Sequence, residues 1–479
     1  MTSRRRFLRQ AGAAGLGLSL PGVTPLARAW ASGASAADAP LDAWAGVEAI
    51  LARIRPPQFP DRDFDVTRFG AAGDGTTLAT KAFRDAIAAC HAAGGGRVVV
   101  PPGRFLTGAI HLESNVNLHV SEGATVAFSQ DPRDFLPVVF TRWEGVELMN
   151  YSPLIYAFER ENVAITGKGT LDGQADETHW WPWKGRRDAG GTPHQGPARA
   201  RLLELAARGV PVAERVFGDG HYLRPNFIQP YRSRNVLIEG VRIVRSPMWE
   251  IHPVLCSNVT VRGVTIDTHG PNNDGCDPES CRDVLIEGCT FDTGDDCIAL
   301  KSGRNDDGRR VNVPVENVIV RDCVMKDGHG GVVIGSEISG GARYVFAERC
   351  QMSSPNLDRA LRLKTNSVRG GTIEHVYMRD VTVGEVAEAV LTVNFFYEEG
   401  DAGKYPPIVR DVELRNVTSR KSKHALLLRG YAHDPIRDVR VVDCGFDGVE
   451  KPDLLEGVAN LTLRNVRVNG QRRDETISR

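Results

Sequence analysis

The segment Asp283-Val-Leu-Ile-Glu-Gly-Cys289-Thr-Phe291 decides the fold, because it repeats the pattern of Asn258-Val-Thr-Val-Arg-Gly-Val264-Thr-Ile266 just before it. Each copy begins with Asn or Asp (occasionally Tyr or His). Val or Leu follows, an apolar residue stands two positions further on, and Val or Cys stands six positions from the start. The intervals between starts run from 22 to 36 residues. The starts are Asn235, Asn258, Asp283, Asn317, Tyr344, His375, Asp411, Asp438 and Asn460.

Repeats of this length, with alternating β-branched residues, are typical of a solenoid whose coils bury their inner faces against their neighbours. A leucine-rich repeat would need a Leu-x-x-Leu-x-Leu frame and helical backs, and neither is present. A propeller would need four strands in each repeat, more than 22 to 27 residues comfortably hold. The sequence therefore predicts an all-β protein, a single-stranded parallel β-helix. Residues that follow neighbouring strands then lie about 4.8 Å apart, although they are some 20 positions apart in the chain.

The chain divides into five predicted parts. Residues 1–36 resemble a twin-arginine signal peptide, since Arg4-Arg5-Arg6-Phe7-Leu8 precedes an apolar run that is too short to span a membrane. We therefore expect a periplasmic or secreted protein, with no membrane contact after signal cleavage. The other parts are a linker with a short helix (37–63), a catalytic β-helix (64–469) with an insertion at 174–224, and a tail (470–479) that we expect to be frayed.

Before the coils, we expect a short helix from Leu41 to Arg55 and a strand from Phe64 to Phe69. A second helix is expected from Thr80 to Ala93, with its apolar residues on one face. A solenoid must cover its first coil, or the open edge will pair with other chains. This N-terminal helix is the predicted cap, and the coils are expected to begin at Arg97, with further rungs near Asn115 and Asn162.

Composition excludes some classes of function. The net charge is −1, with 59 basic and 60 acidic residues, so no overall field favours nucleic acid or a membrane surface. Four of the nine cysteines, Cys289, Cys323, Cys350 and Cys444, occupy the Val/Cys position of the repeat and are expected in the core. The remaining bridge candidates are Cys256, Cys276, Cys281 and Cys297. No cysteine spacing indicates zinc, and no metal or cofactor is predicted.

The insertion contains His179-Trp-Trp-Pro-Trp183 and a possible helix from Ala198 to Arg208. Three tryptophans in four residues suit stacking on sugar rings, but aromatic residues also pack insertions onto their host. Both interpretations stay open at this point. An insertion of this length can also close one end of a groove, which favours attack on a chain terminus.

Six residues whose side chains can take part in catalysis or substrate binding fall in the stretch that follows the first strand of successive coils. Stacking would line them along one groove. Crowded carboxylates repel one another when all are ionised, so one keeps its proton to higher pH while its neighbours stay charged. The cluster therefore supplies both a general acid and a general base. Arg and Lys two positions apart on an extended segment point to one face, where they can hold a carboxylate. The six are Asp274, Asp295, Asp296, His329, Arg362 and Lys364.

Each of these residues has a structural alternative when taken alone. An Asp-Asp pair after Thr-Gly can shape a turn, Gly328-His329-Gly330-Gly331 can be a solvated loop, and Arg362 and Lys364 can form an exposed charged face. Turn formation gives no reason for all of them to align on successive coils. Their alignment therefore favours a site that hydrolyses a glycoside containing a uronic acid.

At these residues the chain resembles the polygalacturonases and relatives of glycoside hydrolase family 28. That family carries Asn-x-Asp, Gly-Asp-Asp, Gly-His-Gly and Arg-Ile-Lys in this order. The resemblance covers about Asp65 to Asn469. The matching segments here are Asn272-Asn273-Asp274, Gly294-Asp295-Asp296, Gly328-His329-Gly330 and Arg362-Leu363-Lys364.

The resemblance implies a right-handed β-helix and a hydrolase of α-1,4 bonds in galacturonate-containing pectin that inverts the anomeric centre. It implies Asp295 as general acid, Asp274 and Asp296 as the residues that activate water, and His329 as the residue that tunes the acid. Arg362 and Lys364 would hold a galacturonate carboxylate, and Asn272 and Tyr397 would contact substrate. We lean toward exo action. The alternatives are a calcium-dependent pectate lyase, since acidic clusters can hold calcium, and a noncatalytic glycan-binding β-helix.

Overall fold

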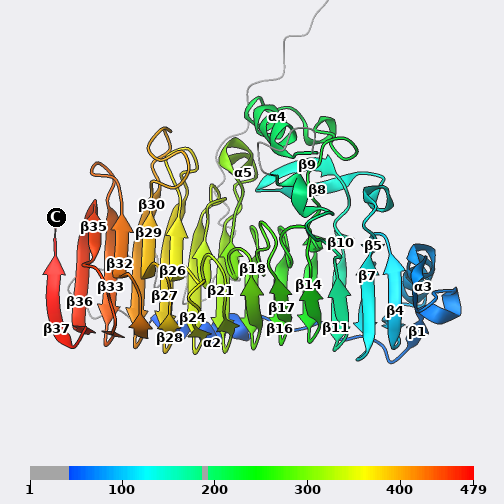
Figure 1. The fold of residues 1–479 in the computed structure, drawn as a ribbon, viewed down its shortest axis with the longest axis horizontal. Coiled ribbons are helices and arrows are strands. Elements are labelled where there is room, and N and C mark those ends of the chain that lie inside the picture. Colours follow the sequence, from blue (N-terminus) through cyan, green and yellow to red (C-terminus); the bar gives the residue numbers. More distant parts are fainter. Residues whose placement is uncertain (1–42, 186–192, 479) are drawn as a thin grey trace, which may run out of the picture. The chain divides into compact units, whose positions relative to one another are not determined.

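The computed structural model describes residues 43–185 and 193–478. The predicted signal peptide lies outside these residues. The chain forms two compact units, Met1–Gly46 and Val47–Arg479. In the first, only the 3-10 turn η1 (Ala43–Gly46) is described. The second is an elongated stack of coils, drawn from blue at one end to red at the other in Figure 1.

The coils form a parallel β-helix, as predicted. The first strand of each coil pairs in parallel with the first strand of the next. These strands are β1 (Asp63–Asp65), β3 (Gly96–Val100), β6 (Val116–Val120), β11 (Glu161–Gly167), β14 (Arg234–Glu239), β16 (Ser257–Arg262), β18 (Arg282–Glu287), β21 (Val315–Arg321), β24 (Ala342–Glu348), β27 (Thr372–Arg379), β30 (Ile408–Arg415), β33 (Ile436–Val442) and β36 (Val458–Val468).

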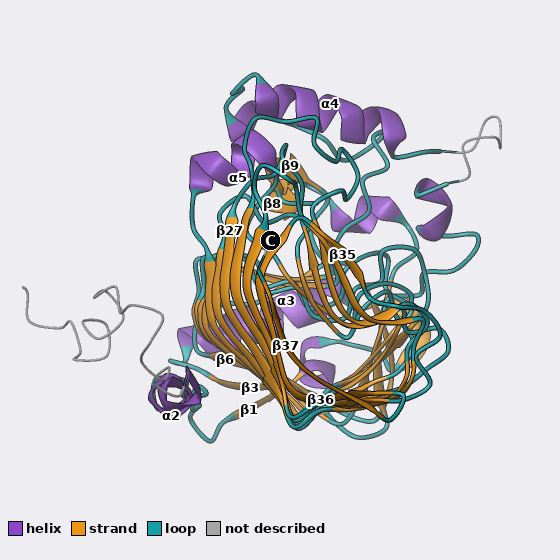
Figure 2. Ribbon diagram, turned by 90° about the vertical axis from the view of Figure 1, so that its left-hand side faces the viewer, coloured by secondary structure: helices purple, strands orange, loops and turns teal. Residues whose placement is uncertain are grey.

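The second and third strands of the coils stack in the same way, and Figure 2 shows the resulting walls superposed along the axis. The second strands are β2 (Asp74–Leu78), β4 (Gly103–Thr107), β7 (Ala124–Phe128), β12 (Thr170–Asp172), β15 (Arg242–Val244), β17 (Thr265–Thr268), β19 (Thr290–Thr293), β22 (Val324–Met325), β25 (Gln351–Met352), β28 (Thr382–Glu385), β31 (Thr418–Lys421) and β34 (Gly445–Phe446). The third strands are β5 (Ile110–His111), β10 (Ile155–Phe158), β13 (Ile228–Tyr231), β20 (Ile298–Leu300), β23 (Val332–Ile334), β26 (Arg359–Lys364), β29 (Ala389–Asn394), β32 (His424–Arg429) and β35 (Leu454–Glu456).

The structure explains why a polar residue, usually Asn or Asp, starts each repeat, which the sequence pattern did not reveal. All nine predicted starts, and also Asn115 and Asn162, adopt left-handed backbone with φ of 54° to 63°. Asn and Asp tolerate this conformation better than most residues. Their side chains also form a ladder from coil to coil: Asn258 Nδ2 donates to Asn235 Oδ1 at 2.7 Å, and Asn235 Nδ2 to Asn162 Oδ1 at 2.8 Å.

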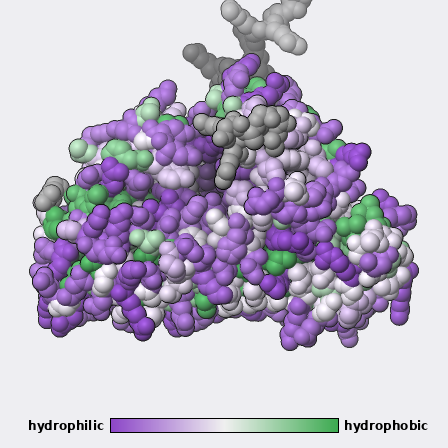
Figure 3. Space-filling model, in the orientation of Figure 1, coloured by the Kyte–Doolittle hydropathy of each residue, from purple (hydrophilic) through white to green (hydrophobic). Residues whose placement is uncertain are grey.

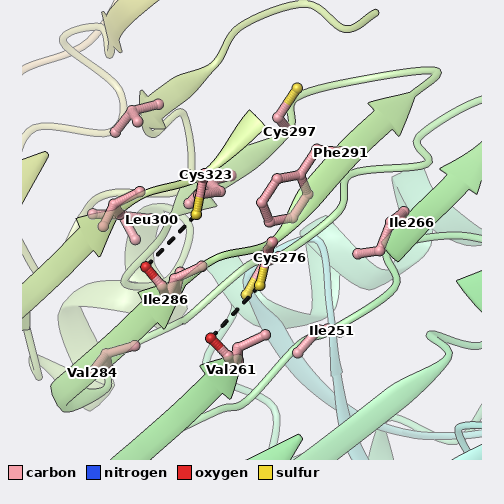
Figure 4. Packing of buried hydrophobic residues seen from close by; sticks show 14 of the residues in the cluster. Ile251, Val261, Ile266, Cys276, Val284, Ile286, Phe291, Cys297, Leu300 and Cys323 are labelled. Atoms are coloured by element: carbon pink, nitrogen blue, oxygen red, sulfur yellow. Dashed lines mark hydrogen bonds between the residues drawn. The ribbon is translucent and has the colours of Figure 1, made fainter. Parts of the chain in front are cut away.

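The interior of the coils is a continuous apolar core, and the Val/Cys position of the repeat lies in it. Cys289, Cys323 and Cys350 are each 1% exposed. In Figure 4 the thiol of Cys323 points to the carbonyl of Ile286, at 3.8 Å. All nine cysteines lie in the described part of the chain, and all are buried and free. The bridge candidates Cys256, Cys276, Cys281 and Cys297 are therefore unpaired and pack as small core residues.

Both ends of the stack are covered. Helix α3 (Thr80–Ala92) lies across the first coil, as predicted, and buries Phe83 and Ile87 against it. The expectation of a frayed tail was wrong, because β37 (Gln471–Ile477) pairs antiparallel with β36. It occupies the hydrogen-bonding edge that β36 would otherwise leave open.

Two further expectations near the N-terminus were wrong. The predicted strand 64–69 ends at Asp65 and continues as the 3-10 turn η2 (Val66–Phe69), because the Asp65 side chain accepts the Thr67 amide at 2.8 Å. The predicted helix 41–55 ends earlier, with α2 (Val47–Leu51), since the Arg55 backbone pairs with the side chain of Asn258. The first coil also starts before Arg97, with β1 and β2.

Two excursions stand above the coils on the side of α4 in Figure 1. One is the antiparallel hairpin of β8 (Val139–Trp143) and β9 (Val146–Asn150). The other is the insertion, with η4 (Trp181–Trp183), α4 (Gly196–Ala207) and η5 (Val212–Glu214). Together they bury a second apolar cluster over Met248 and Trp249. The remaining helical elements are η3 (Pro132–Phe135) and α5 (Asn305–Val311).

The tryptophans of the insertion pack onto the coils. Trp180 is 2% exposed and meets Phe135 edge to face, and Trp181 Nε1 donates to the carbonyl of Ser246 at 2.8 Å. The packing interpretation therefore holds for this segment. Among the described helices, none is long and apolar enough to cross a membrane.

Candidate functional site

The three aspartates come together above the coils. One carboxylate oxygen from each of Asp274, Asp295 and Asp296 lies within 4.8 Å of the other two. Asp274 follows β17, and Asp295 and Asp296 follow β19, which is the next coil. The stacking thus turns a separation of more than 20 residues into direct proximity, as predicted.

Hydrogen bonds fix the loop that carries Asp274. The buried amide of Asn273 accepts from Thr268 Oγ1 at 2.6 Å and donates to the carbonyl of Ser246 at 3.0 Å. The backbone N–H of Glu250 then binds the Asp274 carbonyl at 2.9 Å. Asn273 was not among the expected site residues, yet it orients Asp274.

His329 lies beside Asp295, from the coil after it. His329 Nδ1 is 3.0 Å from Asp295 Oδ1, and the His329 amide donates to the Asp295 carbonyl at 3.1 Å. Gly328 permits this approach, because a Cβ there would lie 2.7 Å from that carbonyl oxygen. The hydrogen bond to Asp295 raises the pKa of His329 to about 9.

Arg362 and Lys364, on β26, both reach Asp296. Lys364 Nζ lies 2.6 Å from Asp296 Oδ2, and Arg362 Nη1 lies 3.4 Å from Oδ1. The two cations also lie against the ring of Tyr397, at 5.2 Å and 5.6 Å from its centroid. They share one face, as their spacing predicted.

Burial and the neighbouring charges distinguish two of the three carboxylates. Burial raises the pKa of Asp274 well above its ordinary value, and the charge of Asp295 adds to this. Burial also opposes the ionisation of Asp295, but the hydrogen bond and charge of His329 outweigh it and hold the pKa of that carboxyl below its usual range. In the unliganded site, therefore, Asp274 is the carboxyl that keeps its proton, while Asp295 is ionised beside a protonated His329.

Each carboxylate already has a cationic partner. Lys301 Nζ lies 3.3 Å from Asp274 Oδ2, Lys364 binds Asp296, and His329 binds Asp295. Calcium binds where several carboxylates are free to turn toward it. This arrangement therefore disfavours the calcium-dependent lyase.

Asp274 and Asp295 line a pocket that opens to solvent. Figure 3 shows a hollow among hydrophilic residues on the face of the molecule that carries α5. Asn272 and Tyr397, both expected substrate contacts, line the pocket. The full lining is Glu144, Lys184, Arg199, Trp249, Asn272, Asp274, Asp295, Lys301, Arg304, Ser336, Glu337, Lys364, Tyr397 and Glu398.

The comparisons agree with this geometry. The model of the glycosyl hydrolases family 28 matches residues 218–462. A probable polygalacturonase of Vitis vinifera is 30% identical over 386 residues, which is 78% of this chain and 71% of that protein. The exo-poly-alpha-D-galacturonosidase of Dickeya chrysanthemi is 28% identical over 75% of this chain and 62% of its own length. The crystal structure of a hyperthermoactive exopolygalacturonase from Thermotoga maritima superposes with a TM-score of 0.88, at 50% identity, over 91% of this chain and 98% of that one.

This chain belongs to glycosyl hydrolase family 28. In this family 28 protein the four motifs named from the sequence all meet at one site. The pocket residues outside those motifs were missed. Lys301 could have been found from the sequence, since a lysine that directly follows the buried apolar strand β20 needs a partner.

Other pocket residues carried no local signal. The ring centroid of Trp249 lies 4.2 Å from Lys301 Nζ, and Trp249 lines this pocket together with Tyr397, whereas the tryptophans of the insertion are not among its lining residues. Arg224 is fully buried, and its Nη2 donates to Asn272 Oδ1 at 2.8 Å, which orients that amide. The hairpin β8–β9 was also missed. The interval of 47 residues between Asn115 and Asn162, longer than the 22 to 36 residues between the starts from Asn235 onward, was the feature of the sequence that indicated it.

Proposed function

We propose that the protein hydrolyses α-1,4 bonds of galacturonan with inversion at the anomeric carbon. The observation that carries the proposal is the cluster of three aspartates beside Arg362, Lys364 and Tyr397. It joins acid and base groups to cations that suit a uronate carboxylate. Family membership, and relatives named as polygalacturonases, support the substrate class.

Asp295 takes a proton from His329 and delivers it to the leaving oxygen, which leaves the imidazole neutral. Its partner His329 holds a proton 3.0 Å away, so the pair keeps one transferable proton at neutral pH. Asp274 and Asp296 position the attacking water. A water that accepts a hydrogen bond from the protonated Asp274 and donates one to Asp296, each about 2.8 Å long, brings the two carboxyl oxygens to within about 4.5 Å of each other, and Asp296 takes the proton that the water loses. The spacing of these carboxylate oxygens, within 4.8 Å, fits that arrangement.

We propose exo action because the hairpin β8–β9 and the insertion both contribute to the wall of the pocket. The hairpin β8–β9 contributes Glu144 to it and the insertion contributes Lys184 and Arg199. A polymer that fills the groove cannot continue through this wall, so the pocket accepts only a chain terminus. The exopolygalacturonase from Thermotoga maritima, at 50% identity, supports this proposal.

Replacing Asp295 tests the assignment. Asp295→Asn removes the acidic proton and should lower the hydrolysis of polygalacturonate by about 1000-fold or more. Asp292→Asn is the matched control, since Asp292 lies on β19, three residues before Asp295, and pairs with His269 and Lys326 instead. Reducing ends are counted, and NMR of the first product should show the β anomer. Full activity in Asp295→Asn, or an unsaturated product that a chelator abolishes, would refute the proposal.

We also propose that the mature protein is periplasmic or secreted by the twin-arginine route, because residues 1–36 resemble a twin-arginine signal peptide. Arg4→Lys with Arg5→Lys should leave the protein in the cytoplasm, as measured by cell fractionation. Undiminished export of this variant would contradict the route.

A further inference from the structure

Three separate segments of the chain meet at Arg304 in the wall of the pocket. Its guanidinium is 3.4 Å from Glu144 on the hairpin, 3.4 Å from Glu337 after β23, and 3.0 Å from Glu398 after β29. Arg304 is only 3% exposed, and its Nε has no hydrogen-bond partner in the described structure. This part of the wall is therefore a built polar surface that keeps an unused donor.

Glu337 is the acceptor in this part of the wall. Its carboxylate contacts Lys301 Nζ and Arg304 Nη1, both at 3.4 Å, and Ser336 Oγ at 3.3 Å. Burial opposes its ionisation, but Lys301 and Arg304 hold the pKa of Glu337 below its usual range. An ionised carboxylate accepts about four hydrogen bonds, and these three contacts are long. Glu337 can therefore accept further hydrogen bonds from a ligand.

The pocket is not a simple cationic site for a carboxylate. Lys184, Arg199, Lys301, Arg304 and Lys364 line it, but an equal number of acidic residues lines it as well. Acidic side chains of this kind suit hydroxyl groups, which donate to carboxylates. A terminal sugar offers such hydroxyls, and a sugar within the chain has its C4 oxygen blocked by the next residue.

Glu337 lies close enough to the catalytic carboxyl of Asp274 for one sugar to contact both. Lys301 contacts both Asp274 Oδ2, at 3.3 Å, and Glu337 Oε2, at 3.4 Å. The ammonium group of Lys301 thus bridges Glu337 and Asp274, the carboxyl group that we assign to water activation. Asp274 lines the pocket, and His329 lies outside its lining. The sugar that water attacks therefore occupies the pocket, and that sugar is the non-reducing terminus.

We propose that Glu337, held by Arg304 and Lys301, accepts the C4 hydroxyl of the non-reducing terminal galacturonate and so determines specificity for a saturated chain end. This inference rests on the proposed galacturonan hydrolysis. A terminus made by a lyase has a double bond between C4 and C5 and no C4 hydroxyl. Such a terminus leaves Glu337 without its partner, which costs transition-state binding.

The experiment compares trigalacturonate with 4,5-unsaturated trigalacturonate as substrates. We expect the wild-type protein to show kcat/KM about 100-fold or more higher for the saturated substrate, as for other sites built around a substrate hydroxyl. Glu337→Gln should lower kcat/KM for the saturated substrate by a similar factor and for the unsaturated one by less than about 5-fold. The ratio between substrates should therefore collapse. Glu374→Gln is the matched control, because Glu374 pairs with Arg410 on the outside of the coils.

The outcomes separate the two proposals. Equal hydrolysis of both substrates by the wild-type protein, or an equal loss on both in Glu337→Gln, overturns the role of Glu337 but not the hydrolysis. Hydrolysis of neither substrate by the folded wild-type protein overturns the proposed function itself. If Glu337→Gln does not fold, Glu337→Asp keeps the charge beside Lys301 and shortens the reach. It should then shift the ratio in the same direction, and an unchanged ratio would reject the inference.

Discussion

His329 controls where a proton resides beside Asp295. The imidazole is half exposed, but its Nδ1 is held at 3.0 Å from the carboxylate by the backbone bond between the same two residues. The pair loses its proton only as the pH approaches the raised pKa of His329, about 9. Without His329, the acid proton would have to reside on the Asp295 carboxyl itself.

His329→Ala should therefore move the basic limb of the pH profile to lower pH. The limb moves to lower pH because, without His329, the transferable proton is lost when Asp295 itself ionises. We expect a shift of more than about one pH unit and a 10- to 100-fold loss of kcat/KM at pH 7. Initial rates between pH 4 and 9 measure it. His269→Ala, which removes the histidine beside Asp292, is the control, and the same basic limb in wild type and His329→Ala would contradict the role.

The hairpin β8–β9 is the element that closes the pocket. Its tip is fixed to the coil, because the Arg304 amide donates to the Gly145 carbonyl at 3.0 Å. Gly145 has φ of +79°, and a Cβ there would lie 2.8 Å from Arg304 N and 2.9 Å from Glu337 Cγ. Buried ion pairs also fix the strands of the hairpin, including Arg142 Nη1 with Glu279 Oε1 at 3.1 Å. Only glycine at 145 allows this close approach.

Gly145→Ala should push the hairpin tip away from the pocket and admit a continuing chain. We expect wild-type protein to release monomer from the start with a slow fall in pectin viscosity. The variant should show a faster fall in viscosity for each bond broken, together with longer products. Gly263→Ala is the matched control, because Gly263 also has positive φ (+59°) but no atom near the added carbon. If the variant's products match those of wild type, the hairpin does not set the mode of attack.

On the scale of the whole molecule, the stack is stable only if both open ends are covered. Each coil buries its core against its neighbours, so a terminal coil without a cover exposes apolar surface and unpaired strand edges. Helix α3 covers one end, and β37 covers the edge of β36 at the other. Arg473 on β37 also pairs with Asp453 at 2.5 Å, which ties the cap to the last coil.

Removal of residues 471–479 should expose the edge of β36 and promote association of chains through it. We expect a lower melting temperature and the formation of larger species, measured by calorimetry and by light scattering after size exclusion. Arg473→Ala, which removes the ion pair but keeps the strand, is the control and should remain as the wild type. A truncated protein that melts and elutes like the full chain would show that β37 is dispensable.

Much of this architecture was predictable because the length and residue pattern of the repeat indicate a β-helix. The spacing of Asn258, Asp283 and their counterparts set the coils, and the coils brought Asp274, Asp295 and His329 together. The N-terminal cap was predictable from one amphipathic helix. The short helix and the strand before the coils were misjudged at their ends, because a side-chain cap at Asp65 and a contact with Asn258 203 residues away decide them.

The sequence by itself determined the coil and the catalytic constellation, since both depend on short patterns repeated at near-constant spacing. The tertiary structure alone decided which residues wall the pocket. Glu144, Arg304 and Glu398 come from segments as much as 254 positions apart that share no pattern. Their meeting depends on how the hairpin and the insertion pack over Trp249, and such packing is set by shape and buried charge that a local sequence does not express.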